Sequence, residues 1–397
     1  MTALLVRDIR PLAGPAADVL VRDGSIAAIA PGLTAPPGTP VEDGAGALLL
    51  PGLIEGHTHL DKTLWHLREW VENDVGPSIQ DKIDNERQWR AAHAHDAGAA
   101  SLAMARLFLA NGTTRIRSFV DIDTEAGLKH LHGVLATRSA MAEVQQIQIV
   151  AFPQSGLLVR PGTDALLDAA LAEGADVVGG LDPCAIDRDP ARHLDVVFGL
   201  AQKHGKPVDI HLHEPGEMGA FSLDLILERT EALGMAGRVV VSHGFCLGMI
   251  DERARDALLD RMARLDVAIA TTAPPSRPVP LVAPCRRAGV AIFGGNDGIR
   301  DTWNPYGTPD MLERAMLIGL RNNFRRDEEI GWALECVTAS AARGCGFGGY
   351  GLAEGCRADF TLVDARSVAE AVVARPVRKL VVSAGRVVAR DGVLAMA

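Results

Sequence analysis

Hydrophobic and polar residues alternate in long blocks through the middle of the chain. Apolar blocks of strand length with few charges are typical of strands that are covered on both faces of a parallel sheet. Eight such blocks lie at residues 47–54, 114–122, 146–153, 175–180, 208–213, 238–243, 267–272 and 290–297. Between most of them apolar residues recur with helical period, as in 163–173, 193–204 and 223–233. This α/β alternation predicts a (β/α)8 barrel of the TIM type, which we assign to residues 51–347.

The two ends of the chain carry a different pattern. Short β-type segments separated by turn residues fill the N-terminal part, and residues 19–29 predict a hairpin with an Asp-Gly turn. Residues 359–364 and 379–388 repeat this pattern of strand and turn near the C-terminus. Both ends together therefore predict one small β-sandwich domain, built from residues 1–50 and 348–397.

Polar side chains typical of catalytic sites follow the predicted strands. In a (β/α)8 barrel the chemistry lies at the C-terminal ends of the strands, and the candidates there are His57, His59, Gln154, His211, His243 and Asp297. Residues i and i+2 of a strand point to the same side, so the imidazoles of His57 and His59 are expected to lie side by side. Burying this many ionisable groups without a partner is costly. One divalent cation would supply the partner, and imidazoles with a carboxylate suit Zn²⁺ or Fe²⁺.

A metal-bound water needs a neighbouring group that carries protons. Glu214 is the candidate, because it lies three residues after His211, just past the strand end. The alternative interpretation is that Glu214 is an ordinary loop carboxylate exposed to solvent. His213 either lines the pocket or only hydrogen-bonds to a neighbour. His243 is expected to orient the hydroxide or to hold the tetrahedral intermediate, and the alternative is a helix cap or a core histidine.

Two further side chains are candidates for substrate binding. The amide of Gln154 can donate and accept, so it can read an amide-like edge of a heterocycle; a plain loop glutamine is the alternative. Trp303 follows the last strand, where its indole can cover a flat ring, and ordinary packing is the alternative. The long crossover from residue 70 to residue 111 is expected to shape the mouth of the site. The other histidines are interpreted as surface or packing residues: His66, His93, His95, His130, His132, His193 and His204.

Composition narrows the class of protein. Hydrophobic residues make up 48% of the 397 residues and aromatic residues only 4%, so the core is mainly aliphatic. The net charge of −10 and the scattered Lys and Arg residues argue against nucleic acid as a partner. Six cysteines without a C-x-x-C pair predict no disulfide scaffold. No apolar run approaches the roughly 20 residues that span a bilayer, and residues 1–8 do not resemble a signal peptide. We expect a cytoplasmic homo-oligomer with a small heterocyclic substrate and no membrane partner.

Several segments match the motifs of a known superfamily. The chain contains P-G-L-I-E-G-H-T-H-L-D-K at 51–62, V-A-F-P-Q-S-G at 150–156, D-I-H-L-H-E at 209–214, S-H at 242–243 and F-G-G-N-D at 293–297. In these motifs, and in its C-terminal β segments, it resembles the amidohydrolase superfamily over nearly its whole length, and within it the cytosine deaminase branch. The resemblance implies that one Zn²⁺ or Fe²⁺ is bound by His57, His59, His211 and Asp297.

The resemblance also implies roles for the neighbouring residues. Glu214 would carry a proton to a ring nitrogen, His243 and Asp297 would activate the water, and Gln154 would hold the amide edge of the substrate. Two-metal members of the superfamily bridge their ions with a carboxylated lysine at a strand end. Residues 146–154 and 175–183 contain no lysine, so the resemblance implies a single metal.

The chain departs from the cytosine deaminase pattern at two positions. Gly298 stands where that branch has a second Asp, and Phe119 stands where it has a His. Residues 179–183 and 297–303 are as similar to the N-isopropylammelide amidohydrolases of triazine breakdown, although these have Asp at the position of Glu214. The reaction type is therefore better defined than the substrate.

The sequence thus predicts a metal-dependent hydrolytic deaminase of a small nitrogen heterocycle. The leading interpretation is cytosine or a close pyrimidine as substrate, with release of ammonia. The alternative is an N-alkylammelide amidohydrolase that releases an amine from an s-triazine. A remote alternative is a non-catalytic amidohydrolase-like scaffold, which is disfavoured because such proteins typically lose the metal ligands that this chain retains.

Overall fold

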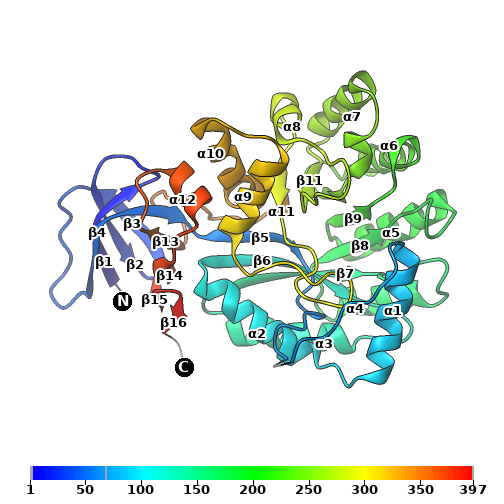
Figure 1. Cartoon of the computed structure of the whole chain (residues 1–397), viewed down its shortest axis with the longest axis horizontal. Coiled ribbons are helices and arrows are strands. Elements are labelled where there is room, and N and C mark those ends of the chain that lie inside the picture. The colour runs from blue at the N-terminus through cyan, green and yellow to red at the C-terminus, as the bar shows by residue number, and fades with distance from the viewer. Residues whose placement is uncertain (1–2, 68, 396–397) are drawn as a thin grey trace.

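Eight parallel strands form a barrel in the computed structural model, which describes residues 3–67 and 69–395 (Figure 1). The strands are β5 (Leu53–Thr58), β6 (Thr113–Asp121), β7 (Gln146–Phe152), β8 (Val177–Leu181), β9 (Val208–Leu212), β10 (Val239–His243), β11 (Ala268–Thr271) and β12 (Ile292–Gly294). Neighbours in chain order pair in parallel from β5 to β12. The barrel closes where the Asp297 amide donates to the His57 carbonyl at 2.8 Å. The predicted TIM-type (β/α)8 fold is confirmed.

Helices lie between the strands and cover the outside of the barrel (Figure 1). They are α1 (Ile79–Ala92), α2 (Ala97–Ala110), α3 (Lys129–Met141), α4 (Thr163–Ala172), α5 (Pro190–His204), α6 (Gly216–Ala232), α7 (Glu252–Arg264), α8 (Val282–Ala288), α9 (Met311–Arg321), α10 (Asp327–Cys336) and α11 (Ala339–Cys345). Local chemistry sets their ends. Before α5, the Asp189 carboxylate accepts from the Arg192 amide, and Gly205 ends the helix with a φ of 63°.

The terminal strands form a second eight-stranded sheet beside the barrel. Its strands are β1 (Ala3–Pro11), β2 (Ala17–Arg22), β3 (Ser25–Ala30), β4 (Val41–Pro51), β13 (Phe360–Val363), β14 (Arg378–Ser383), β15 (Arg386–Arg390) and β16 (Val393–Leu394). The predicted hairpin is present, because Arg22 pairs with Ser25 around the Asp-Gly turn. Ser25 also bridges to Arg357, so the sheet curls over one apolar core shared by both termini. A small β domain built from both termini is confirmed, and its exact boundaries at 50 and 348 stay a prediction.

The first apolar block, residues 47–54, is not one barrel strand as the sequence suggested. Its larger part belongs to β4, which pairs in parallel with β1 and antiparallel with β13. The chain passes between the sheets at Gly52, where a Cβ would collide with Thr114. Leu49 faces the core of the terminal domain, whereas Leu48 and Leu50 face the main core. Both faces of β4 are buried, so its hydrophobic pattern does not show which sheet it joins.

The long crossover after β5 holds two helices, and the first of them docks onto the C-terminal end of the barrel. Helix α1 buries few apolar side chains and is attached mainly by polar contacts. Asn85 donates to the Thr302 carbonyl at 3.0 Å, and Arg90 lies 3.3 Å from Asp121 and 3.1 Å from Asp123. The crossover therefore contacts loops at the strand ends, in agreement with the expectation that it shapes the mouth of the site.

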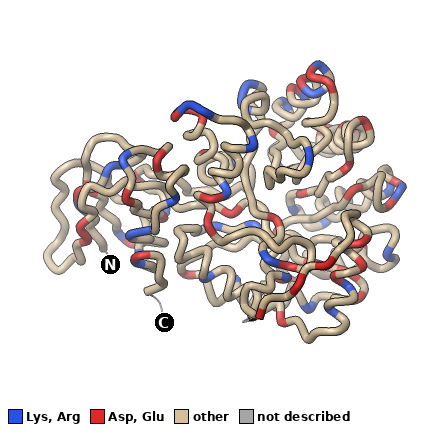
Figure 2. Tube along the Cα trace, in the orientation of Figure 1, with Lys and Arg blue, Asp and Glu red and all other residues tan. Residues whose placement is uncertain are grey.

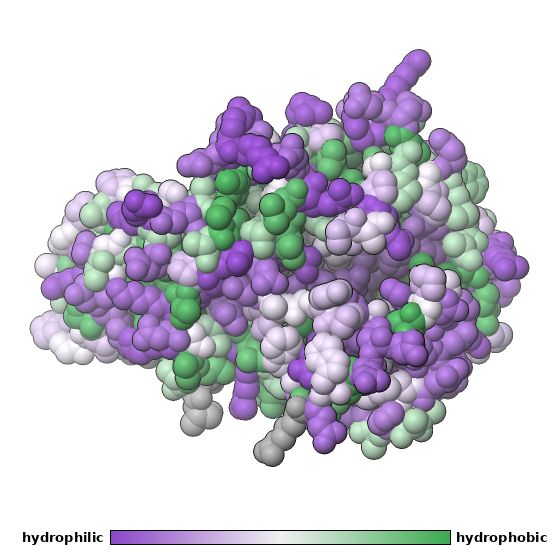
Figure 3. Space-filling view, in the orientation of Figure 1, coloured by the Kyte–Doolittle hydropathy of each residue, from purple (hydrophilic) through white to green (hydrophobic). Residues whose placement is uncertain are grey.

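Charged and apolar residues are mixed over the surface. Figure 2 shows Lys and Arg interspersed with Asp and Glu along the trace. On the face drawn in Figure 3, hydrophobic residues form small groups between hydrophilic ones. None of the described helices is both long enough and apolar enough to cross a lipid bilayer. The structure thus agrees with the scattered basic charge seen in the sequence.

Gly295→Ala is expected to destabilise the barrel where it closes. A Cβ at residue 295 would lie 2.5 Å from the backbone N and O of His57, and this backbone cannot move aside as a flexible side chain can. Overpacking of this kind costs about 1–3 kcal/mol. The matched control is Gly199→Ala in α5, where nothing lies within 4 Å of the added Cβ and stability should rise by about 0.5–1 kcal/mol. Thermal and denaturant unfolding compare the two, and a Gly295→Ala protein as stable as wild type contradicts this account.

Candidate metal centre

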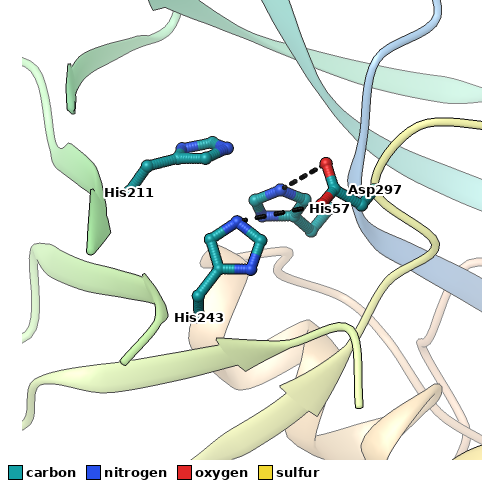
Figure 4. Close-up of side chains that lie close together, drawn as sticks. All are labelled: His57, His211, His243 and Asp297. Carbon is teal, nitrogen blue, oxygen red and sulfur yellow. Dashed lines mark ion pairs between the residues drawn. The ribbon is translucent and has the colours of Figure 1, made fainter. Parts of the chain in front are cut away.

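Four side chains from distant parts of the chain meet at the C-terminal end of the barrel (Figure 4). His57 lies in β5, His211 in β9 and His243 at the end of β10, and Asp297 follows β12. One ligand atom from each of them lies within 4.8 Å of the others. Asp297 Oδ1 is 3.6 Å from His57 Nε2, and its Oδ2 is 3.9 Å from His243 Nε2. The expected convergence of these strand ends is confirmed.

His59 joins the same group through Asp297. Its Nε2 lies 3.1 Å from Asp297 Oδ1, and its ring centroid lies 5.8 Å from that of His57. The two imidazoles are therefore neighbours, as the i and i+2 spacing predicted. His243 lies as close to the centre as the residues expected to bind metal. The ligand set of His57, His59, His211 and Asp297 accordingly stays a prediction.

The electrostatics of this group fit a divalent cation. Burial lowers the pKa of His211 and of His243 well below the usual value, and it lowers the pKa of His59 to about 4, so these imidazoles are neutral. Burial opposes ionisation of Asp297, but the neighbouring imidazoles of His57 and His59 hold its pKa well below its usual range. Neutral imidazoles and an ionised carboxylate are the forms that bind metal. Several of these ring nitrogens are buried without a hydrogen-bond partner: His57 Nε2, both nitrogens of His211 and both nitrogens of His243.

Two of these residues have a strained backbone conformation. His243 has a φ of 69° and Asp297 a φ of 66°, a left-handed conformation that residues with a Cβ rarely adopt. Each stands where a barrel strand gives way to its loop. Such strain persists only where the surrounding structure enforces it, and it is typical of functional sites.

Two aromatic rings form an apolar side of the group. The ring centroid of Phe119 lies 4.2 Å from that of His57 and 4.5 Å from that of His211, and Phe152 lies 4.1 Å from His211. Phe119 thus places a hydrocarbon ring where the cytosine deaminase pattern has an imidazole. At the other departure, a Cβ on Gly298 would collide with the Asp301 carboxylate. A second Asp next to Asp297 would therefore require the Asp301 side chain to move.

Glu214 is buried beside the group, but its carboxylate is held by other partners. Its Oε1 accepts from the amides of Cys184 and Ala185 at 2.7 and 2.8 Å, and its Oε2 accepts from the Ser222 hydroxyl. Burial raises the pKa of Glu214. Among the described residues, no hydrogen bond or ion pair joins Glu214 to the metal-binding candidates. Its role as proton carrier stays a prediction.

His213 lines the group and is held by a carboxylate. Its Nδ1 lies 2.7 Å from Asp182 Oδ2, and its amide donates to Asp182 Oδ1 at 2.6 Å. The rings of His213 and His243 are 4.3 Å apart. His213 thus hydrogen-bonds to a neighbour and its ring lies beside that of His243, and its contact with substrate stays a prediction. The sequence did not single out Asp182, which follows β8 and has a φ of 37°.

Gln154 has a buried cationic partner that the sequence analysis missed. Lys62 Nζ donates to Gln154 Oε1 at 2.5 Å and lies 3.5 Å from Asp121 Oδ1. Only 5% of Lys62 is exposed. Burial opposes its charge, but Asp121 and Glu86 raise its pKa, so it stays protonated. In the sequence, the only feature that pointed to Lys62 was its position in the motif that also contains His57 and His59.

Trp303 contacts this cation. Lys62 Nζ lies 5.0 Å from the centroid of the Trp303 ring, and the indole Nε1 donates to Glu86 Oε2 at 2.7 Å. Glu86 belongs to α1 and is itself 3.6 Å from Lys62 Nζ. The indole therefore belongs to a polar wall formed with the crossover helix, and its contact with substrate stays a prediction.

His130, interpreted from the sequence as a surface or packing residue, is buried close to the centre. Its Nδ1 lies 2.7 Å from Asp61 Oδ2, and the same oxygen accepts from the Asp121 amide at 3.0 Å. Asp61, Asp121 and His59 each have a ligand atom within 4.8 Å of the other two. These contacts join residues about 60 positions apart, so they leave no trace in local sequence pattern.

Comparisons with known proteins agree with this site and fold. A family model described as "Amidohydrolase family" matches residues 41–389. The crystal structure of N-isopropylammelide isopropylaminohydrolase from Burkholderia multivorans ATCC 17616 is 63% identical, covers 100% of both chains and has a TM-score of 0.97. N-isopropylammelide isopropyl amidohydrolase from Pseudomonas sp. (strain ADP) is 28% identical over 89% of this chain and 88% of its own length.

The deaminase branch is also represented among the similar structures. 5-Methylcytosine deaminase from Klebsiella pneumoniae, liganded with 5-fluorocytosine, is 26% identical, covers 99% of both chains and has a TM-score of 0.87. Both branches named from the sequence motifs are thus confirmed as relatives. The barrel, the convergent histidines and the family match over most of the chain lead to one conclusion: this chain belongs to the amidohydrolase family.

Proposed function

We propose that this protein is a metal-dependent enzyme that hydrolyses the bond between an s-triazine ring and an alkylamino group, with an N-alkylammelide as substrate. The observation that carries the proposal is the 63% identity, over the complete chain, to N-isopropylammelide isopropylaminohydrolase from Burkholderia multivorans. The sequence motifs favoured cytosine as the substrate. That reading has weaker support, because the 5-methylcytosine deaminase structure is only 26% identical and the pattern of that branch is broken at Gly298 and Phe119.

The polar wall of the site suits a ring that carries carbonyl oxygens. Lys62 occupies the oxygen of the Gln154 amide, so this glutamine offers its amide NH₂ as a donor. The ammonium of Lys62 is a second buried donor in this wall, and its charge is paired with Asp121 and Glu86. An ammelide ring carries two ring carbonyls, so it offers two acceptors to these donors. Cytosine has one carbonyl, and it therefore matches them less well.

We propose that His57, His59, His211 and Asp297 hold one divalent ion, Zn²⁺ or Fe²⁺. The chemistry that such an ion supplies is a hydroxide nucleophile at neutral pH. Around it, His243 lies beside Asp297, where the two can take the proton of the attacking water. The ring would bind with the carbon that bears the alkylamino group facing this point. The oxygen of the water bonds to that carbon, the bond from the carbon to nitrogen breaks, and the amine leaves with a proton.

Glu214 is the proposed carrier of that proton. Its carboxyl is buried with a raised pKa, as suits a group that alternately binds and releases a proton. The bonds that it makes to Cys184, Ala185 and Ser222 fix the position of its carboxylate, directly after His213 in the chain. Catalytic hydrogen bonds often form fully only once the substrate is bound.

The metal proposal predicts one divalent ion for each chain. Removal of this ion with a chelator should lower the midpoint of thermal unfolding, because a ligand that binds only the folded state stabilises it. His211→Ala should lose both the ion and this shift. The control is His132→Ala, whose side chain is 58% exposed and pairs with Glu173 on the surface. Elemental analysis and thermal unfolding measure both effects, and a His211→Ala protein with its full metal content contradicts the proposed ligand set.

The substrate proposal predicts a clear ranking in an assay panel. Metal-loaded enzyme should release isopropylamine from N-isopropylammelide with a kcat/KM at least a hundredfold above that for ammonia release from cytosine. Chromatography of amine and ring product measures both reactions. Faster turnover of cytosine would reinstate the pyrimidine reading. Absence of turnover with every pyrimidine and triazine would contradict the proposed substrate class and favour the non-catalytic scaffold.

Glu214→Gln should fold and keep its metal but lose turnover by about 10²-fold or more, because a carboxamide cannot carry the proton. Glu217→Gln, three residues further on in the exposed first turn of α6, is the matched control and should keep wild-type turnover. Steady-state kinetics together with metal analysis separate the two variants. Near-normal rates for Glu214→Gln would contradict the proposed proton transfer, and the role of Glu214 would then be only to accept hydrogen bonds from the amides of residues 184 and 185.

A further inference from the structure

A row of buried polar side chains crosses the barrel interior beneath the metal centre, and the steps described above do not use it. The Ser242 hydroxyl lies 2.9 Å from Nδ1 of His57 and donates to Asp209 Oδ1 at 2.7 Å. The other oxygen of Asp209 accepts from Arg117 Nη1 at 2.8 Å. The row therefore runs from a proposed metal ligand on β5, through β10 and β9, to a guanidinium on β6, the strand that pairs with β5.

Every member of this row is removed from solvent. His57, Ser242 and Asp209 are 0% exposed, and Arg117 is 2% exposed. Asp209 lies two residues before His211 on β9, so both side chains point into the barrel, with Asp209 one layer deeper. Charges buried to this extent are costly unless they are paired and hydrogen-bonded.

Arg117 anchors the deep end of the row. Its Nε donates to Gln148 Oε1 at 2.7 Å, and its Nη2 donates to the Cys345 carbonyl at 2.9 Å. With the bond to Asp209, all three guanidinium nitrogens have partners. These bonds fix the Asp209 carboxylate against β6, β7 and the end of α11, so its position does not depend on the metal centre.

The hydrogen bonds of the row can be oriented, from donor to acceptor, in only one way. A carboxylate paired with a guanidinium only accepts hydrogen bonds, so the single proton of the Ser242 hydroxyl goes to Asp209. The Ser242 oxygen must then accept from His57, which places the ring proton on Nδ1. His57 Nε2 is left with a free lone pair 3.6 Å from Asp297 Oδ1, and it has no hydrogen-bond partner.

We infer that Ser242, Asp209 and Arg117 are positioning residues that fix the tautomer and the ring orientation of His57 for metal binding. The inference rests on the metal centre of the proposed function but not on its substrate. Partners of this kind, one bond removed from the metal, typically change metal affinity by 10–100-fold when they are lost. A purely structural role in joining strands would change stability and leave metal affinity as it is.

The test uses the full-length protein and the metal ions themselves. Ser242→Ala removes only the hydroxyl, and Ser101→Ala is the matched control, because its buried hydroxyl bonds to Thr137 outside the barrel. Metal-free protein is titrated with Zn²⁺ in competition with a chelator, and the absorption spectrum of the Co²⁺ form is recorded. Ser242→Ala should bind Zn²⁺ 10–100-fold more weakly and shift the Co²⁺ spectrum, while Ser101→Ala should match wild type in both.

Asp209→Asn gives a second line of evidence, since its amide can donate toward Ser242 and reverse the row. Because both variants act through one hydrogen-bonded row, the loss of Zn²⁺ affinity in the double variant should fall short of the sum of the single losses. Additive losses, or a folded Ser242→Ala protein with wild-type Zn²⁺ affinity and Co²⁺ spectrum, overturn the inference. Weakened Zn²⁺ binding in Ser242→Ala supports the inference even if the wild-type protein turns over no triazine. Absence of triazine turnover would contradict only the proposed substrate.

Discussion

The closure of the barrel between its first and last strands is the constraint on which the site depends. There the Asp297 amide donates to the His57 carbonyl at 2.8 Å, and the Thr58 hydroxyl donates to the Asp297 carbonyl at 3.0 Å. Glu55 reinforces the junction, because its carboxylate accepts from the amides of His57 and Asn296. Burial raises the pKa of Glu55 to about 7. The backbone bonds of this junction put the first histidine and the aspartate side by side before any metal binds.

The site has two halves that differ in electrostatic character. One half contains neutral imidazoles over the rings of Phe119 and Phe152, where burial disfavours charge. The other half contains Lys62 and its acidic partners, including Glu86 from the crossover helix. A divalent metal ion suits the first half, because neutral ring nitrogens and one carboxylate would bind the ion and leave it with a net positive charge. In the second half, the Gln154 amide and Lys62 are the donors on which the proposed binding of the triazine ring rests.

Family membership and substrate rest on different parts of this structure. The imidazoles and Asp297 come from strand ends, whose geometry any (β/α)8 barrel supplies, and they agree with the family match. The residues on which the proposed substrate rests lie in loops and in the crossover. Gly298 leaves space that the Asp301 carboxylate fills, and Lys62, after β5, donates to Gln154, after β7. For this reason the motifs led to the correct family and both of its branches, while they ranked cytosine first.

The sequence by itself determined the barrel strands and the histidines at their ends, because apolar runs and i and i+2 spacing are local properties of the chain. It also determined the small β domain of the two termini. Only the tertiary structure decided that the block at 47–54 divides at Gly52, since a strand buried on both faces looks the same in either sheet. Only the tertiary structure placed Lys62 on Gln154, turned Glu214 toward Ser222 and joined Ser242 to Asp209. Most of these contacts link residues tens of positions apart on different strands and loops, and such contacts exist only once the barrel has closed.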